Sequence, residues 1–295
     1  MRNCSLARRL LIAALITAYP GASLPAKSTL EPPQVTLPNR PKAVRFAIIG
    51  DNGTGGRAEY EVATQMSRAH TSFPFDAVLM LGDNMYGEKK AVDYRRKFEE
   101  PYETLLEEGV KFYASLGNHD DPNERFYKPF NMNGQRYYSI RMGDAEFFAL
   151  DSTYLDPKQL DWIDKQLSNS RARWKICFFH HPPYSAAHSH GPELDLRKRL
   201  EPLFEKYGVN VVLSGHEHVY ERIKPQHGIY YFVLGNAGQL RAHDLRRSPE
   251  TAKGFDTDRA FMLMEISDEL YFQTFARTGK TVDSGVIANR NESGK

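Results

Sequence analysis

Cysteine is scarce in this sequence, and the scarcity excludes a fold held together by disulfides. Only two cysteines occur among the 295 residues. Cys4 lies in a segment that we expect to be removed, which leaves Cys177 without a partner inside one mature chain. Cys177 lies in the apolar run 174–179, so we interpret it as a buried strand residue that packs like a small hydrophobic side chain. A nucleophilic role is disfavoured, because reactive thiols need an electropositive and partly exposed setting.

A surplus of charge of either sign is also lacking. Lys and Arg total 39, and Asp and Glu total 37. The first 23 residues contain three arginines and no acid, so the rest of the chain has 36 basic and 37 acidic residues. A chain with this balance lacks the excess of basic residues that binds the phosphates of a nucleic acid. We therefore expect no nucleic-acid partner.

The first 23 residues have the three parts of a secretory signal peptide. Three arginines at positions 2, 8 and 9 precede an apolar stretch from Leu10 to Ala18, and small residues follow at 21–23. The apolar stretch is too short to span a bilayer comfortably as a helix. A cleaved signal is therefore favoured over an uncleaved anchor. We predict an exported protein, secreted or periplasmic, with no stable membrane association once residues 1–23 are removed.

The remaining chain divides into a short proline-rich segment and one larger unit. Residues 24–41 contain five prolines and little periodicity, which predicts a linker or an extended arm. From residue 42 onward, short apolar runs and longer amphipathic segments alternate, then strands dominate; this predicts layered sheets with helices outside. Strands are expected at 44–49, 76–81, 111–115, 136–141, 146–150, 174–179, 209–213, 230–234, 261–266, 270–276 and 281–288, and helices at 58–70, within 94–108, at 157–167 and at 194–207.

Five of the expected strands run directly into a polar cluster. The clusters read GDNG at 50–53, GDNMY at 82–86, GNHD at 117–120, HH at 180–181 and GHEH at 215–218. Ligands of open α/β sheets bind outside the carboxyl ends of the strands, so we expect the clusters to converge on one edge. Each cluster alone is weak evidence, because a Gly-Asp pair after a strand is usually a turn or a helix cap. Five such clusters at strand ends favour a common site.

The clusters supply seven side chains that can bind metal. Oxygen and imidazole ligands without thiolate suit hard or borderline ions such as Fe, Mn and Zn. Seven donors are too many for one ion, but they fit two ions that share a carboxylate. The two histidines of the GHEH cluster lie two positions apart, so in an extended segment they point to the same side and can reach neighbouring ions. The candidate ligands are Asp51, Asp83, Tyr86, Asn118, His180, His216 and His218.

In this order, the motifs resemble those of the calcineurin-like metallophosphoesterases. The resemblance depends on five motifs: DNG at 51–53, GDNMY at 82–86, GNHD at 117–120, the histidine at 180 and GHEHVYER at 215–222. Tyr86 narrows the resemblance to the purple acid phosphatases, which use a tyrosine at this position as an Fe(III) ligand. Among them the chain looks most like the short, tartrate-resistant type. The resemblance implies an α/β fold: a four-layer α/β/β/α sandwich of two mixed β-sheets flanked by helices. Residues 42–295 would form its catalytic domain.

Carried over position by position, the resemblance implies a binuclear centre of Fe(3+) and a divalent ion, which is Fe, Zn or Mn. The ferric ion would be held by Asp51, Tyr86 and His218. The divalent ion would be held by Asn118, His180 and His216. Asp83 would bridge the two ions, and His181 matches no ligand position.

Two further histidines are candidate catalytic residues. A leaving alkoxide needs a proton or a cationic neighbour. His119, beside the candidate ligand Asn118, is the first candidate, and His190 is the second. The resemblance supports both as groups that contact phosphate. His188 lies close enough in the sequence to take the place of His190.

Together these features predict an exported acid phosphatase that hydrolyses phosphate monoesters by attack of a metal-bound hydroxide. Its substrates would be small phosphate esters, and a trivalent ion would permit activity in acid because it acidifies bound water strongly. The same metal core could instead serve a phosphodiesterase or a nucleotide pyrophosphatase. A non-hydrolytic iron-binding redox protein is the alternative from another class. The segment Tyr220-Glu221-Arg222 either orients His218 or begins the next strand.

Overall fold

The computed structural model describes residues 30–290. The predicted signal peptide, residues 1–23, lies outside this range. Within it, residues 30–41 form neither helix nor strand and lie beside the first sheet. The backbone N–H of Thr36 donates to Gln273 Oε1 at 2.8 Å, and that of Arg40 donates to Glu265 Oε1 at 3.1 Å. No helix in residues 30–290 combines the length and the apolar character needed to cross a bilayer.

Six strands form the first sheet, in the order β13-β12-β11-β1-β2-β3. Strands β1, β2 and the edge strand β3 run parallel to one another. Strands β11, β12 and β13 are antiparallel to their neighbours. Every residue of β2 is buried, as expected for a strand covered on both faces. The strand bounds are β1 (Val44–Ile49), β2 (Ala77–Leu81), β3 (Lys111–Ser115), β11 (Ala260–Ile266), β12 (Leu270–Ala276) and β13 (Thr281–Ile287).

Seven strands form the second sheet, in the order β10-β8-β9-β7-β6-β5-β4. Here β5, β6, β7 and β9 run parallel, and β4, β8 and β10 pair antiparallel with their neighbours. Both sheets are therefore mixed. The strand bounds are β4 (Tyr138–Met142), β5 (Ala145–Ala149), β6 (Trp174–Phe179), β7 (Val211–Ser214), β8 (Tyr220–Ile223), β9 (Tyr230–Leu234) and β10 (Thr251–Phe255).

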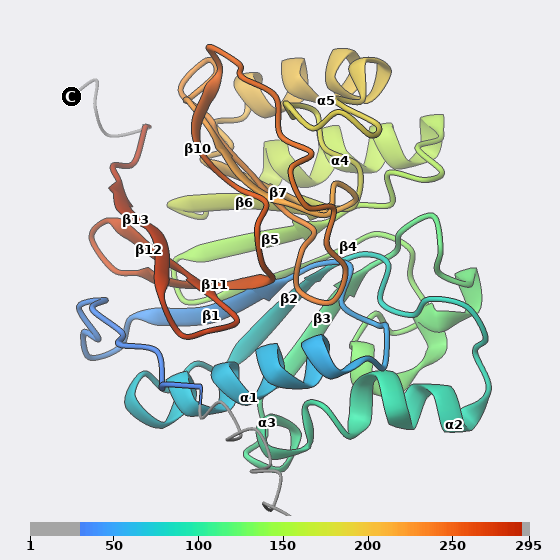
Figure 1. The fold of residues 1–295 in the computed structure, drawn as a ribbon. Coiled ribbons are helices and arrows are strands. Elements are labelled where there is room, and N and C mark those ends of the chain that lie inside the picture. The colour runs from blue at the N-terminus through green and yellow to red at the C-terminus, as the bar shows by residue number, and fades with distance from the viewer. Residues whose placement is uncertain (1–29, 291–295) are drawn as a thin grey trace, which may run out of the picture.

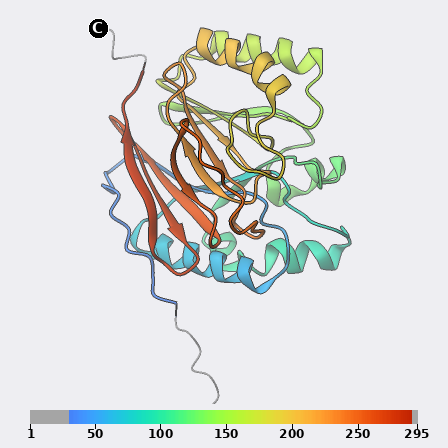
Figure 2. The ribbon, with the colours of Figure 1, turned by 45° about the horizontal axis from the view of Figure 1, so that its top comes forward.

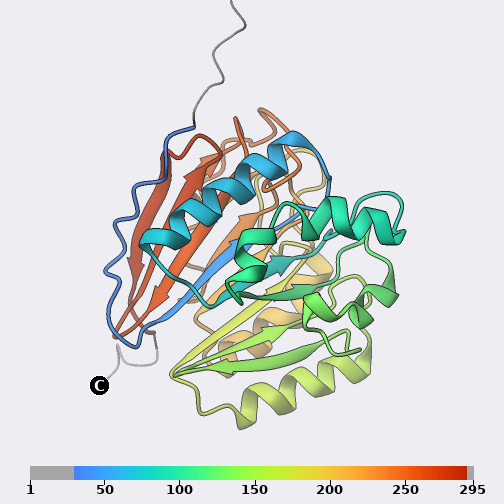
Figure 3. The same cartoon turned by 90° about the horizontal axis from the view of Figure 1, so that it is seen from below.

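Helices cover the outer face of each sheet. Figure 1 shows α1, α2 and α3 below the first sheet and α4 and α5 above the second, and Figure 3 shows α1 lying across the first sheet. In Figure 2, α4 and α5 lie side by side at the top, on the face of the second sheet that points away from the first sheet. The predicted four-layer α/β/β/α sandwich is confirmed. The helix bounds are α1 (Arg57–Ser72), α2 (Ala91–Tyr94), α3 (Glu103–Glu107), α4 (Pro157–Asn169) and α5 (Leu194–Lys206).

The core joins the four layers. Between the sheets, Phe46 of β1 meets Phe147 of β5 edge to face, with ring centroids 5.0 Å apart. A second cluster fills the space under α4 and α5 and includes Ile163 and Phe204. Cys177 belongs to that cluster and is fully buried, as predicted. Close packing in these two core clusters fixes the positions of the strand ends relative to one another.

Several local predictions differ from the structure. The helical material expected within 94–108 is broken into α2, a π-helical turn at Arg95–Glu99 and α3. Residues 220–223 are strand β8, so the Tyr220-Glu221-Arg222 segment does begin a strand. Strand β10 was not expected: TAKGF is an edge strand whose side chains are partly or fully exposed, so it carries no apolar alternation that would mark it.

Candidate metal centre

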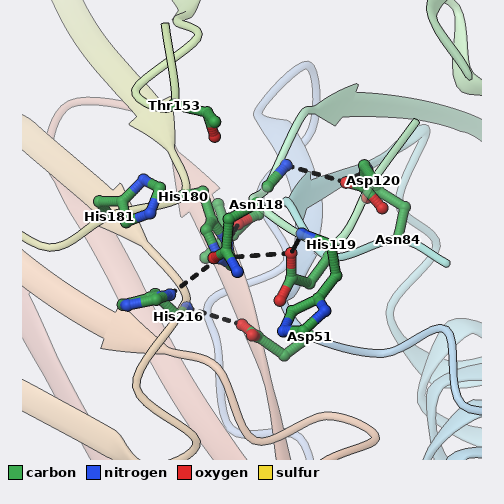
Figure 4. A network of polar contacts seen from close by, with 12 residues as sticks. Asp51, Asn84, Asn118, His119, Asp120, Thr153, His180, His181 and His216 are labelled. Carbon is green, nitrogen blue, oxygen red and sulfur yellow. Dashed lines mark hydrogen bonds and ion pairs between the residues drawn. The ribbon is translucent and has the colours of Figure 1, made fainter. Parts of the chain in front are cut away.

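The five polar clusters follow strands whose carboxyl ends meet between the two sheets. Three of them follow β1, β2 and β3 of the first sheet, and two follow β6 and β7 of the second. Because the strands run parallel within each sheet, their carboxyl ends lie on the same side. Figure 4 shows side chains from these loops turned toward a common centre. All seven candidate ligands are brought together there.

The chain turns sharply where it leaves three of these strands. Asp51, Asp83 and His216 have φ angles of 55°, 51° and 70°, in the left-handed region that non-glycine residues rarely occupy. Such a residue costs of order 1–3 kcal/mol and persists only where its surroundings hold it. Asp51 N–H donates to Gly82 O at 3.0 Å, and His216 N–H donates to Asp51 Oδ2 at 2.8 Å. The turns are thus tied to one another, and they aim three side chains at the centre.

Two glycines allow the backbone to approach the candidate ligands closely. A Cβ atom on Gly117 would lie 2.2 Å from Asp83 Oδ1, and one on Gly215 would lie 2.5 Å from Asp51 Oδ2. Both distances are far below van der Waals contact. Any side chain at these positions would therefore displace a carboxylate of the site.

Asp51, Tyr86 and His218 form a first triad of converging atoms. Tyr86 Oη lies 2.9 Å from Asp51 Oδ1 and 3.1 Å from His218 Nε2. His218 Nε2 is 3.3 Å from Asp51 Oδ1. The three atoms lie close enough to be ligands of one ion.

Asn118, His180 and His216 form a second triad. His180 Nδ1 lies 2.9 Å from Leu81 O, and only an N–H can face a carbonyl oxygen. This contact places the proton on Nδ1 and leaves the lone pair of Nε2 facing the centre, the usual arrangement behind a metal-binding histidine. His180 Nε2 lies 3.0 Å from Asn118 Oδ1 and 3.1 Å from His216 Nδ1.

Asp83 lies between the two triads. Its Oδ1 is 3.4 Å from His180 Nε2 in the second triad. Its carboxylate also forms a group with Asp51 and His218 of the first triad, with ligand atoms within 4.8 Å of one another. The backbone N–H of His119 donates to Asp83 Oδ1 at 2.9 Å. Asp83 is therefore placed to be shared.

The electrostatics of the donor set fit cations. Burial, and then the neighbouring Asp83, raise the pKa of Asp51. Burial and the neighbouring imidazoles lower the pKa of His216 to about 2, and burial, then Arg241, lower that of His218 to about 4. Two buried carboxylates side by side are costly without a cation, and unprotonated imidazoles are metal ligands. The residues thus fit a binuclear centre of oxygen and nitrogen ligands without thiolate.

The candidate catalytic histidines flank the two triads. His119 is exposed on the loop after β3, and its ring centroid lies 5.0 Å from that of Tyr86. His190 stacks on His216, with centroids 4.4 Å apart and planes at 30°. His188, the open alternative, is exposed, and its backbone N–H donates to Asp244 O. It is therefore His190 that packs on a candidate ligand.

His181, which matches no ligand position of the motif resemblance, lies beside the second triad. Its ring centroid is 4.5 Å from that of His216, and its Nδ1 lies 2.9 Å from Ser152 Oγ. The same hydroxyl accepts the backbone N–H of His181 at 3.0 Å. These contacts join the loop after β6 to the loop after β5.

Three charged residues that support the site were not assigned to it from the sequence. Asp120 accepts hydrogen bonds from Asn84 Nδ2 at 2.7 Å, Met85 N at 3.0 Å and Gly117 N at 2.9 Å, and so joins the loops after β2 and β3. Burial, and then Asp83, raise its pKa to about 7. The other two residues are Glu217 and Arg241. An acid between two candidate ligand histidines is the sequence signal for Glu217. Arg241 lies in a run of basic residues that the sequence favours as a solvated face over a contact with the outer part of a substrate.

Known proteins share the fold and the motif region. The family model for the calcineurin-like phosphoesterase matches residues 44–220. Human tartrate-resistant acid phosphatase type 5 is 27% identical over 292 residues, covering 81% of this chain and 89% of that protein. Among solved structures, GAP50, the anchor in the inner membrane complex of Plasmodium, has a TM-score of 0.73 at 18% identity and covers 85% of this chain and 90% of its own. Purple acid phosphatase PPD1 from yellow lupin seeds has a TM-score of 0.69 at 21% identity, covering 85% of this chain and 55% of that one.

Proposed function

The chain belongs to the calcineurin-like phosphoesterase family, and on that premise we propose that it is an exported acid phosphatase that hydrolyses small phosphate monoesters. In its motifs and fold it is a purple-acid-phosphatase-like metallophosphoesterase, an enzyme with a binuclear metal centre. The fold alone does not decide the activity, since a Plasmodium anchor protein shares it. The proposal therefore depends on the donor atoms of the site.

One observation carries the proposal: two triads of donor atoms converge, and Asp83 lies between them. We assign one ion to each triad and the shared position to Asp83, as the contacts of each triad favour. Two bound ions would supply polarisation of the phosphoryl oxygens and a water of lowered pKa as the nucleophile. The rest of the catalysis is positioning and electrostatic stabilisation by the protein.

We assign iron to the triad that contains Tyr86. Burial, and then Asp51 and Asp83, raise the pKa of Tyr86, so a phenolate forms there only next to a strongly Lewis-acidic cation. Fe(3+) is such a cation, and Fe, Zn or Mn suits the amide oxygen and imidazoles of the other triad. A ferric ion would also permit activity in acid, because it acidifies bound water more strongly than a divalent ion.

The two flanking histidines would then divide the remaining tasks. His119 lies beside Tyr86 of the first triad, and His190 lies on the ring of His216 of the second triad. Burial, then Arg241, lower the pKa of His190, so we assign the transfer of a proton to the leaving oxygen to His119. His190 would donate a hydrogen bond to the phosphoryl group. Both assignments require reach to a substrate held between the triads.

The decisive experiment compares an aryl phosphate with the corresponding bis-aryl diester, at pH 5 and pH 7.5, by release of inorganic phosphate and of phenol. We expect the monoester to be hydrolysed, faster at pH 5. Turnover of the diester alone would overturn the monoester assignment in favour of a phosphodiesterase. Colour without release of phosphate would identify an iron protein that does not hydrolyse esters.

Two matched substitutions test the assignment of the site. Asp83→Asn should lower kcat/KM by more than about 100-fold, since even groups behind metal ligands are worth about 10- to 100-fold. Asp76→Asn is the control, because Asp76 is exposed and lies at the other end of β2. An equal effect of both substitutions would contradict the shared-carboxylate role of Asp83.

The metal assignment is tested by metal analysis and the visible spectrum of the mature protein. We expect two ions per chain, one of them iron, and a violet absorbance that Tyr86→Phe abolishes. Tyr113→Phe, on β3 outside the site, should keep the colour. A colourless, iron-free and fully active enzyme would refute the iron assignment.

We also propose export through removal of residues 1–23. Expression of the full chain in a bacterial host should place the mature protein, shorter by about the length of this segment, outside the cytoplasm. Recovery of the full-length chain from the cytoplasm or the membrane would contradict this proposal.

A further inference from the structure

Arg241 makes a direct contact with the candidate catalytic residue His190. Its Nη1 lies 3.0 Å from His190 Nδ1. A guanidinium group has N–H donors and no acceptor, so in this contact Nδ1 accepts the hydrogen bond. The proton of the neutral ring is then on Nε2. Arg241 comes from a loop 51 positions further along the chain, so the contact depends on the tertiary fold.

Glu217 contacts both the loop that carries His190 and the side chain of Arg241. It is fully buried between His216 and His218, and its Oε1 accepts the backbone N–H groups of His190 at 3.1 Å and Gly191 at 2.6 Å. Its Oε2 lies 3.6 Å from Arg241 Nη1. One buried carboxylate thus joins the loop of His190 to the arginine that contacts its ring.

The backbone of Arg241 is attached to the candidate metal centre as well. Its N–H donates to His218 O at 3.0 Å. This hydrogen bond fixes the backbone from which the Arg241 side chain extends. The His190 ring that the guanidinium contacts is stacked on His216, with ring centroids 4.4 Å apart. Stacking sets the plane of the His190 ring. A 180° flip about the Cβ–Cγ bond keeps that plane but exchanges Nδ1 with Cδ2, and it is open to the ring because the outer torsion of histidine is broad and roughly two-fold. The groups that face Nδ1 distinguish the two orientations: Arg241 Nη1 lies within hydrogen-bond distance at 3.0 Å, whereas Glu217 Oε1 is farther away at 3.7 Å.

We propose that Arg241, supported by Glu217, is a positioning residue that holds His190 with Nε2–H directed at the substrate phosphoryl group. The inference rests on the proposed function and deepens it. It separates His190, a fixed hydrogen-bond donor, from His119, the group that transfers a proton. It also assigns Arg241 an action through His190 rather than a contact with substrate.

A double-mutant cycle tests whether Arg241 acts through His190. With 4-nitrophenyl phosphate, Arg241→Met should lower kcat/KM by about 10- to 100-fold, as is typical for partners that orient a functional side chain. In the His190→Ala background the same change should cost less than about twofold, because the oriented ring is already absent. Arg241→Lys, which keeps a cationic donor, should recover part of the loss.

Arg247→Met is the matched control, since Arg247 is an exposed arginine of the same loop. It should leave kcat/KM unchanged. Equal costs of Arg241→Met in both backgrounds would overturn the proposal, since they would indicate a direct contact with substrate or a general structural role. An equal cost of Arg247→Met would overturn it too, since the effect would then be the charge of the loop.

A measurement without turnover keeps the test independent of the proposed function. Long-range 1H–15N NMR spectra of the zinc-loaded protein at pH 7.5 report which ring nitrogen of each histidine carries the proton. We expect His190 to be the Nε2–H tautomer in the wild type and to lose this single form in Arg241→Met. A His190 protonated on Nδ1 in the wild type would refute the inference, even if phosphate esters are hydrolysed. Absence of hydrolysis with the expected tautomer would refute only the proposed function.

Discussion

One added methyl group at Gly117 should disable the candidate metal centre while the fold persists. The Cβ of Gly117→Ala would lie 2.2 Å from Asp83 Oδ1 and 2.4 Å from Asp83 N. Contacts below about 3 Å do not occur for real Cβ atoms, so the Asp83 carboxylate or its loop must move by roughly 1 Å. A misplacement of that size costs on the order of 100-fold in rate. The overpacking itself should cost about 1–3 kcal/mol of stability.

The assay combines kcat/KM for an aryl phosphate, metal content per chain and thermal unfolding. We expect about a 100-fold loss of kcat/KM and less than two metal ions per chain, with a cooperative unfolding transition at a lower temperature. Gly56→Ala is the control: its φ of −94° suits any residue, and the nearest atom to its added Cβ would be Thr54 Oγ1 at 3.3 Å. If Gly117→Ala binds both ions and keeps kcat/KM within threefold of the wild type, the proposed role of Asp83 is wrong.

Three further predictions concern stability and reactivity. Burial raises the pKa of Glu59 in the folded state from 4.5 to about 8, so its contribution to stability is complete below pH 4.5 and is lost as the pH rises toward 8. Glu59→Gln should therefore flatten the pH dependence of the free energy of unfolding in urea by at most about 5 kcal/mol; an unchanged slope would contradict this. Chelation should lower the free energy of unfolding by about 4 kcal/mol if the metal was present at 1,000 times its Kd, and addition of metal should restore it; equal urea midpoints with and without chelator would argue against a tightly bound centre. Cys177 is fully buried, and burial raises the pKa of its thiol, so a thiol reagent should modify it only in urea; rapid modification of the native protein would place it at the surface.

Much of the fold was predictable because apolar strands and polar turns are local features. Strands at 44–49, 111–115, 174–179, 230–234 and 270–276 begin and end where their apolar runs do. The prediction failed where local pattern carries little information. Strand β10 is an exposed edge, and the broken helical segment after residue 90 contains a π-helical turn. In both cases pairing or packing with distant segments, rather than periodicity, selects the conformation.

The sequence by itself determined the candidate ligands, because all of them lie in the polar clusters that follow the carboxyl ends of five strands, where open α/β sheets bind their ligands. The motif resemblance implied that Asp83 is shared between the two triads, but the sequence did not determine that the ligands come from both sheets. That relation depends on how the sheets pack. Only the tertiary structure decided that His190 rather than His188 stacks on His216, and that Arg241 and Glu217 contact it. These contacts join segments far apart in the chain, and the energies that form them come from burial and from hydrogen bonds that exist only once the loops have packed.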